Sequence, residues 1–235
     1  MYNVLAISCH PDDMEICCGG TLLRCVKRGD NVTVCHVANG DMGHVVIEKE
    51  ELRKTRIAEA KKAGDMAGFK TVTCDVGDLL VDSSSKEQHD KLVKIIREAR
   101  PDFIITHGPD DYMSDHTETG KLVFKAAFSA TVPHYEKGLG EACQVVPIFY
   151  MDNSSLLSCE PTEYVDITDE LETKLEMLKC HESQIVWLRD HDDNDIIDVT
   201  RTFARIRGIQ SGVKYAEGFR QCMTDHRIRT KRFLP

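Results

Sequence analysis

The sequence of 235 residues has no apolar run approaching the roughly 20 residues that a membrane-spanning helix needs. It also lacks an excess of positive charge, because 30 Lys and Arg stand against 39 Asp and Glu for a formal net charge of −9. This balance gives no electrostatic footprint for phosphate backbones, and the short basic segment 227–233 is expected to be a solvated end. We therefore expect neither a membrane nor a nucleic acid as partner.

Cysteine spacings typical of zinc knuckles or redox motifs are missing as well. The ten cysteines contain no C-x-x-C pair, and Cys17 and Cys18 are direct neighbours. The first eight residues have no positively charged leader and no small-residue cleavage site, and they lead straight into a predicted strand. We therefore expect a cytoplasmic protein whose cysteines are small buried hydrophobes and not disulfides.

Internal repeats and low-complexity linkers are absent, and short apolar segments alternate with longer segments of helical periodicity. Strands are predicted at 3–8, 31–38, 71–76, 102–107 and 146–151, with a weaker one at 163–168. Helices are predicted near 15–28, 48–67, 86–99, 117–129, 169–183 and 196–208. The pattern predicts an α/β, Rossmann-like three-layer fold with a mostly parallel sheet, formed by residues 1–235 as a single domain.

Polar residues follow two of the predicted strands directly. His10, Asp12 and Asp13 come after the first strand, and the segment 106–116, "THGPDDYMSDH", comes after the fourth. Ligands bind outside the carboxyl ends of strands in open α/β sheets, so the two segments face one crevice if these strands are neighbours.

Two interpretations of these residues remain open. In the first, Asp12 caps a helix and Glu15 completes a capping box. This interpretation explains neither His10 nor the polar residues after the fourth strand, at the same predicted edge of the sheet: Asp110, Asp111, Asp115 and His116. In the second, a divalent metal such as Zn²⁺ relieves the repulsion among the carboxylates, although no H-E-x-x-H spacing identifies the ligands.

Several motifs resemble the PIG-L/LmbE-like family of zinc-dependent N-acetylglucosaminyl deacetylases. The most specific is the combination of "HPDDME" (10–15) and "CGGTL" (18–22) with the later Asp115-His116. Weaker matches follow at 38–43, 56–68, 96–112, 179–184 and 215–219, so that the resemblance covers nearly the whole chain. It implies a hydrolase that removes an N-acetyl group from an N-acetylglucosamine-type sugar or conjugate.

The resemblance also implies roles for individual residues. His10, Asp13 and His116 would hold Zn²⁺ or another divalent transition metal, and Asp12 would be the general base on the zinc-bound water. Asp115 would support a ligand histidine, with a solvated loop acid as the alternative.

Four residues are expected at the substrate: Arg56, Met113, Asp115 and His181. Arg56 would contact substrate hydroxyls, or else form an exposed pair with Glu59. His181 belongs to an "H-x-S-Q" motif and would line the site, or else be a satisfied helix-end histidine. The resemblance also allows a homo-oligomer, since homo-oligomers are common in the family, but no feature of the sequence marks an interface.

The chain departs from the family pattern at Met113. Many members carry a histidine here, three residues before the last metal ligand, and a thioether cannot donate its proton. Asp12 would then both take and return the proton, unless His107 or His181 replaces the missing acid. Met113 also predicts a more apolar pocket wall and hence an altered substrate group.

Two other functions compete with a deacetylase. One is a metal-containing sugar-binding protein with weak or no activity, because Met113 replaces the usual histidine. The other is a nucleotide binder without metal, suggested by "CGG" (18–20), although neither G-x-G-x-x-G nor a P-loop is present. The acidic segment 189–195 is predicted to be a solvated loop, with a lid over the crevice as a lesser alternative.

Overall fold

A seven-stranded sheet forms the centre of the computed structural model, which describes residues 1–153, 155–156, 160–224, 227 and 234. The strands are β1 (Asn3–Ser8), β2 (Asn31–Ala38), β3 (Lys70–Val76), β4 (Phe103–Thr106), β5 (Ile148–Met151), β6 (Glu163–Asp166) and β7 (Ala216–Gln221). Their order is β3-β2-β1-β4-β5-β7-β6, and β1 to β5 are mutually parallel. Because β7 pairs antiparallel with β5 and β6, the sheet is mostly parallel, as predicted.

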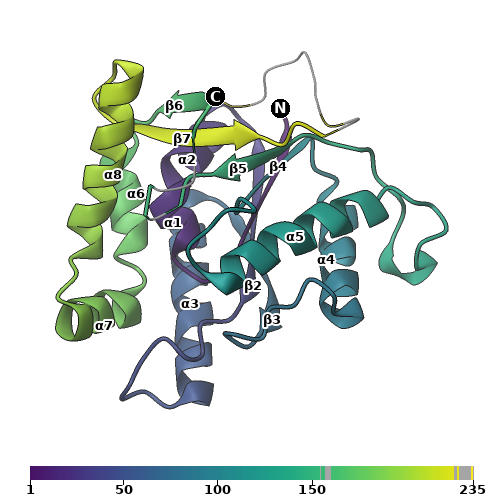
Figure 1. Ribbon diagram of the computed structural model, residues 1–235, viewed down its shortest axis with the longest axis horizontal. Helices are drawn as coiled ribbons and strands as arrows, with labels where there is room; N and C mark the ends of the chain where they lie inside the picture. The colour runs from purple at the N-terminus through teal and green to yellow at the C-terminus, as the bar shows by residue number, and fades with distance from the viewer. Residues whose placement is uncertain (154, 157–159, 225–226, 228–233, 235) are drawn as a thin grey trace.

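Helices cover both faces of this sheet, which confirms the three-layer α/β fold (Figure 1). One face carries α1 (Asp13–Cys17), α2 (Gly19–Lys27), α3 (Lys49–Ala67), α6 (Leu171–Leu178) and α8 (Ile196–Ser211), with α7 (Glu182–Asp192) packed against α3 and α8. The other face carries α4 (Lys86–Ala99) and α5 (Ser114–Ser129). A short 3-10 turn (Lys137–Leu139) follows α5.

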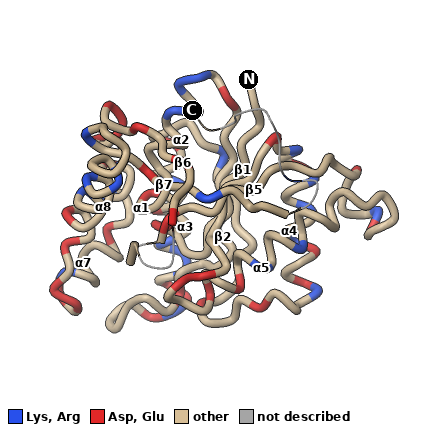
Figure 2. The backbone as a smooth tube through the Cα atoms, turned by 45° about the horizontal axis from the view of Figure 1, so that its top comes forward, with Lys and Arg blue, Asp and Glu red and all other residues tan. Residues whose placement is uncertain are grey.

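Alternation along the strands divides the core between the two faces. In β1, Val4 and Ala6 pack toward α2 and α3, whereas Leu5 and Ile7 pack toward α4 and α5. These four side chains are at most 1% exposed, because β1 is flanked by a strand on each side and by helices on both faces. Figure 2 shows that the central strands β1, β2 and β5 carry no Lys, Arg, Asp or Glu, while charged residues are interspersed along α7 and α8.

The predicted helix 15–28 is in fact two helices, α1 and α2, separated at Cys18. The reason is a carboxylate that the sequence pattern did not reveal. Glu217 on β7 is buried and accepts hydrogen bonds from the backbone N–H groups of Gly20 (2.9 Å) and Thr21 (2.7 Å), and from Nζ of Lys174 (2.6 Å). The first turn of α2 is thus capped from the far end of the chain.

The cap by Glu217 argues against the interpretation of "CGG" as a nucleotide-binding segment. The amide groups that would receive a phosphate already bind the Glu217 carboxylate, and a Cβ on Gly20 would lie 2.7 Å from the Ile167 side chain. Gly20 therefore serves close packing between α2 and the segment after β6.

Other boundaries differ by small amounts. The predicted helix 169–183 corresponds to α6, which ends at Leu178, whereas neither the helix α7 nor the strand β7 was predicted. The segment 189–195 is a loop only from Asp193, because residues 189–192 form the exposed last turn of α7.

The remaining expectations have mixed outcomes. The nine cysteines that the structure describes are free, and eight of them are buried. No helix among the described residues is long and apolar enough to span a membrane. The basic segment 227–233 lies outside the described residues except for Arg227, which is buried and not solvated.

Candidate active site

His10, Asp13 and His116 meet where the strand order reverses. β1 is flanked by β2 and β4, so the segments after β1 and β4 leave the sheet at one edge. His10 lies in the first segment, Asp13 begins α1, and His116 lies in the first turn of α5. The crevice expected from the sequence is therefore present.

The three side chains are close enough to share one ion. His10 Nδ1 lies 3.3 Å from His116 Nε2 and 3.7 Å from Asp13 Oδ2, and His116 Nε2 lies 3.4 Å from Asp13 Oδ1. A tetrahedral ion with bonds of about 2.0–2.1 Å separates its ligand atoms by about 3.3–3.4 Å. The two imidazoles and one carboxylate thus fit a divalent metal and leave a fourth position open.

A carboxylate stands behind each histidine. Asp115 Oδ2 lies 3.4 Å from His10 Nε2 and accepts the backbone N–H of Leu79 at 2.7 Å. Asp111 Oδ1 lies 3.1 Å from His116 Nδ1. Carboxylates in this position fix the tautomer and orientation of metal-binding imidazoles.

His107 lies behind the cluster and not in the crevice. It is 1% exposed, its ring stacks on His116 at a centroid distance of 4.1 Å, and its Nε2 lies 3.2 Å from Asp13 Oδ2. Burial alone would raise the pKa of the Asp111 carboxyl, but hydrogen bonds from His107 and His116 hold that pKa below its usual range. His107 thus contacts Asp13, and Asp111 contacts His116, so that these two residues position two of the three candidate ligands.

Asp12 has an unusual backbone and a buried carboxylate. Its φ is 107°, a conformation that costs energy for a residue with a Cβ and is often found at functional sites. Its side chain caps no amide of α1, so the capping interpretation is wrong. Burial raises the pKa of Asp12 to about 6, although the guanidinium of Arg56 opposes this effect.

Arg56 is buried and reaches the crevice from α3. Its Nη2 donates to Asp12 Oδ2 at 3.0 Å and to the carbonyl oxygen of Pro11. Gly40 makes this possible, because its φ is +79° and a Cβ there would lie 2.5–2.7 Å from the Arg56 side chain. The alternative pair with Glu59 does not form, since Glu59 instead accepts from the backbone N–H (2.8 Å) and Oγ (2.7 Å) of Ser183.

A cavity of about 330 Å³ opens beside the cluster. The residues that line it are His10, Asp12, Asp13, Ile16, Gly43, Arg56, Asp78, Tyr112, Met113, His116, Gln184, Leu188, Asn194, Ile196 and Val199. Of the residues predicted at the substrate, the lining includes Arg56 and Met113 but neither Asp115 nor His181.

His181 lies behind the floor of the site. It is fully buried at the start of α7, and its Nε2 lies 3.3 Å from Oε2 of Glu15, which is on α1 one turn after Asp12. Although burial opposes the charged imidazole, Glu15 raises the pKa of His181. The imidazolium in turn lowers the pKa of Asp12.

Some lining residues were not anticipated. Asp78 accepts the backbone N–H groups of Gly40 (2.8 Å) and Met42 (3.0 Å), and Asn194 follows α7. Asp78 comes two residues after β3 at the carboxyl edge, which is a signal that could have identified it. No comparable signal marks Asn194, because helix packing brings it to the cavity.

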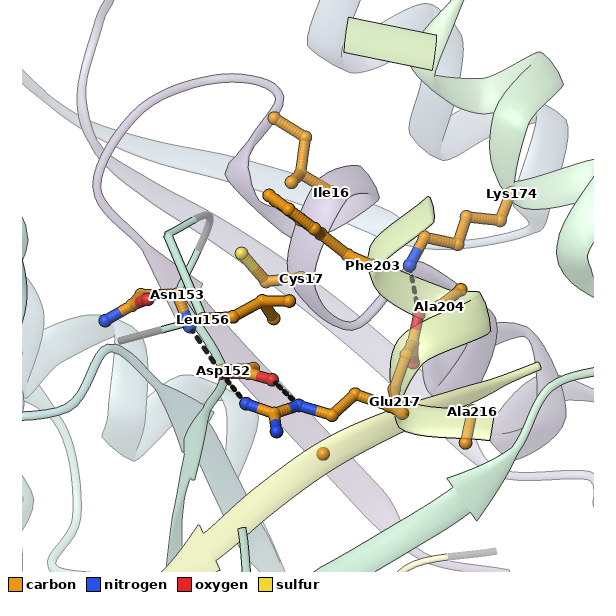
Figure 3. A pocket seen from close by; sticks show the side chains of 12 residues that line it. Ile16, Cys17, Asp152, Asn153, Leu156, Lys174, Phe203, Ala204, Ala216 and Glu217 are labelled. Carbon is orange, nitrogen blue, oxygen red and sulfur yellow. Dashed lines mark hydrogen bonds and ion pairs between the residues drawn. The ribbon is translucent and has the colours of Figure 1, made fainter. Parts of the chain in front are cut away.

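A second cavity, of about 20 Å³, also has Ile16 in its lining (Figure 3). Two buried ion pairs face it: Lys174 with Glu217, and Arg207 with Asp152, whose Oδ2 lies 2.5 Å from Nε of Arg207. A space of this size holds about one water molecule and not a sugar.

Comparisons with known proteins identify the family of this chain. The family model described as GlcNAc-PI de-N-acetylase (PIG-L) matches residues 5–127, which contain the three candidate ligands and Asp12. A diacetylchitobiose deacetylase from Thermococcus kodakarensis is 30% identical over 93% of this chain and 82% of its own length.

Solved structures share the fold. An N,N'-diacetylchitobiose deacetylase from Pyrococcus horikoshii, solved with an inhibitor, superposes with a TM-score of 0.81 at 28% identity, covering 93% of this chain and 83% of its own. A 4-carboxy-2-hydroxymuconate hydratase from Pseudomonas putida superposes with a TM-score of 0.83 at 20% identity and covers both chains fully. At this identity the likeness concerns the fold, which hosts more than one reaction.

Proposed function

The chain belongs to the PIG-L family, and from this premise we propose that it is a metal-dependent hydrolase removing an N-acetyl group from an N-acetylglucosamine-type sugar or conjugate. The single observation that carries the proposal is Asp12, a carboxylate without a capping role that faces the cavity beside three side chains spaced for one ion. A single catalytic domain over residues 1–235 is part of the proposal, because β5 and β7 extend the sheet beyond the matched region.

His10, Asp13 and His116 are the proposed metal ligands, with zinc as the preferred ion because two imidazoles and a carboxylate suit a borderline cation. A metal held there supplies Lewis acidity to the amide carbonyl and lowers the pKa of water. Asp115 and Asp111 keep the histidines oriented, since each carboxylate lies against the ring nitrogen that faces away from the cluster.

Asp12 is the proposed general base, and it also returns the proton to the leaving amine. Met113 lines the cavity but has no proton to give, and neither His107 nor His181 lines it. Among the described residues, three carboxylates line the cavity. Asp13 is a proposed metal ligand and Asp78 accepts hydrogen bonds from loop amides, which leaves Asp12 to accept and return the proton. A carboxyl pKa of about 6 suits a group that must hold and release a proton near neutrality.

Arg56 has the proposed task of orienting Asp12 and the sugar together, because its guanidinium contacts Asp12 and also lines the cavity. His181 is a proposed positioning residue, which supports α1 through Glu15 from outside the cavity. The free cysteines of the described chain support the proposal of a reducing, cytoplasmic location.

Acetate release from N-acetylglucosamine and its glycosides by metal-loaded protein tests this function. We expect release that stops when the metal is chelated and returns when Zn²⁺ is restored. Asp12→Asn is the matched control, because it retains the shape of the side chain but cannot accept the proton. It should bind metal as the wild type does and release at least about 100-fold less acetate.

Two results would contradict the proposal. Equal activity of the Asp12→Asn variant would remove Asp12 from the reaction. Stoichiometric metal binding with no release from any acetylated sugar would favour the sugar-binding protein without chemistry.

A further inference from the structure

The active-site cavity has one wall that the acetyl group cannot explain. Six apolar side chains from α1, the β4–α5 loop, α7 and α8 line it: Ile16, Tyr112, Met113, Leu188, Ile196 and Val199. An acetyl group offers a single methyl to such a surface. The sugar hydroxyls need polar partners, which the lining also offers at Arg56, Asp78 and Gln184.

The charge of the site is also one-sided. Within the described part of the chain, Arg56 is the lining residue with a permanent positive charge, and Asp12 neutralises it. Asp12, Asp13 and Asp78 line the cavity, and Asp111 and Asp115 lie directly behind the histidines. Five carboxylates exceed one guanidinium and one divalent cation, so the site stays net negative with a metal bound.

We propose that the sugar substrate carries an uncharged, ring-bearing aglycone, whose apolar face packs against Leu188, Ile196 and Val199. This inference rests on the proposed function and narrows its substrate class. A phosphate or carboxylate on the aglycone would enter a negative cavity without a free cation, which like-charge repulsion disfavours. The apolar wall would gain free energy by removing the ring from water.

A matched pair of substrates tests the charge. Phenyl and 4-carboxyphenyl 2-acetamido-2-deoxyglucopyranosides, each as both anomers, have the same ring and differ by one carboxylate. We expect kcat/KM for the phenyl glycoside to be at least about tenfold higher than for the carboxyphenyl glycoside. The phenyl glycoside should also exceed the methyl glycoside by about tenfold, because of the apolar wall.

A charge placed in the wall should change this preference. Val199→Lys adds a cation to the cavity and should reduce the preference for the phenyl over the carboxyphenyl glycoside by about threefold or more. Ile209→Lys is the matched control: it adds the same charge on the same helix, at a 64% exposed position about 15 Å further along α8. It should leave the preference unchanged, and Leu188→Lys provides a second test if Val199→Lys fails to fold.

Three outcomes would overturn the inference: equal turnover of the two phenyl glycosides, no advantage of phenyl over methyl, or a preference for N-hexanoyl over N-acetyl sugars that the aglycone does not affect. The last would assign the wall to the acyl group. Calorimetric affinities of the same glycosides for the Asp12→Asn protein separate the two proposals. If no sugar is hydrolysed, the proposed function fails, and the ratio of affinities still decides the inference.

Discussion

Replacing Asp12 by Asn is expected to abolish hydrolysis and, at neutral pH, to stabilise the metal-free protein against unfolding. The Asp12 side chain is 12% exposed, and burial raises its pKa from 3.8 to about 6 despite the contact with Arg56. At 1.36 kcal/mol for each pKa unit, the fold disfavours the charged carboxylate by about 3 kcal/mol. Asn has no charge, still accepts a hydrogen bond from Arg56 and tolerates a positive φ.

The gain in stability should depend on pH in a defined direction. Because the folded protein binds this proton more tightly than the unfolded chain, the wild type loses stability as the pH rises from about 4 to about 6. Below about pH 4 both states are protonated, so the Asn variant should gain nothing there. Above about pH 6 it should gain the full amount, of order 3 kcal/mol.

Urea denaturation of the two proteins in the presence of a chelator measures this difference. Asp12→Ala serves as control: it removes the charge, but also the acceptor for Arg56 and the tolerance for φ 107°, so its gain should be smaller. The reasoning would be refuted by an Asn variant no more stable than the wild type at neutral pH, or by a gain of equal size at about pH 4.

Three other changes test separate parts of the structure. Met113→His supplies the imidazole that many family members carry at this position, and we expect a faster reaction or a displaced acidic limb in the pH profile of kcat; identical profiles would deny position 113 a proton role. Gly40→Ala forces a Cβ against the Arg56 side chain at φ +79°, so urea unfolding should show a loss of about 2 kcal/mol or more, and a loss below about 0.5 kcal/mol would contradict the close approach. Lys174→Met leaves Glu217 buried without its cation and should cost about 3–5 kcal/mol by the same assay, whereas Lys179→Met on the exposed side of the same segment should cost under about 0.5 kcal/mol.

Much of the fold was predictable because its signals are local. β1 and β2 have the predicted bounds, and α4 does too, since apolar runs and helical periodicity mark them in the sequence. β7 was missed because Glu217 and Gly218 interrupt its apolar pattern, and both serve distant neighbours. The break between α1 and α2 was missed because the carboxylate that caps α2, Glu217, lies 197 residues after Gly20 in the chain.

In the candidate site, too, some features were predictable from the sequence and others depend on packing between distant elements. The convergence of His10, Asp13 and His116 followed from their positions after neighbouring strands, together with the family resemblance. The part of the cavity wall that α7 and α8 form could not be predicted, because Leu188 and Val199 reach it through the packing of these helices, which no local pattern encodes. The same holds for the buried position of His181 behind Glu15.

The cap that Glu217 provides for α2 has a consequence for the order of assembly. Its two amide partners lie 197 and 196 residues earlier in the chain. At about 5–20 residues per second, a ribosome needs about 10–40 seconds to make the intervening segment. During that time α2, which directly follows the helix α1 that begins at Asp13, lacks its capping carboxylate. We therefore expect a nascent chain halted before residue 217 to show a protease-sensitive α1–α2 region, while β1 to β4 already pair.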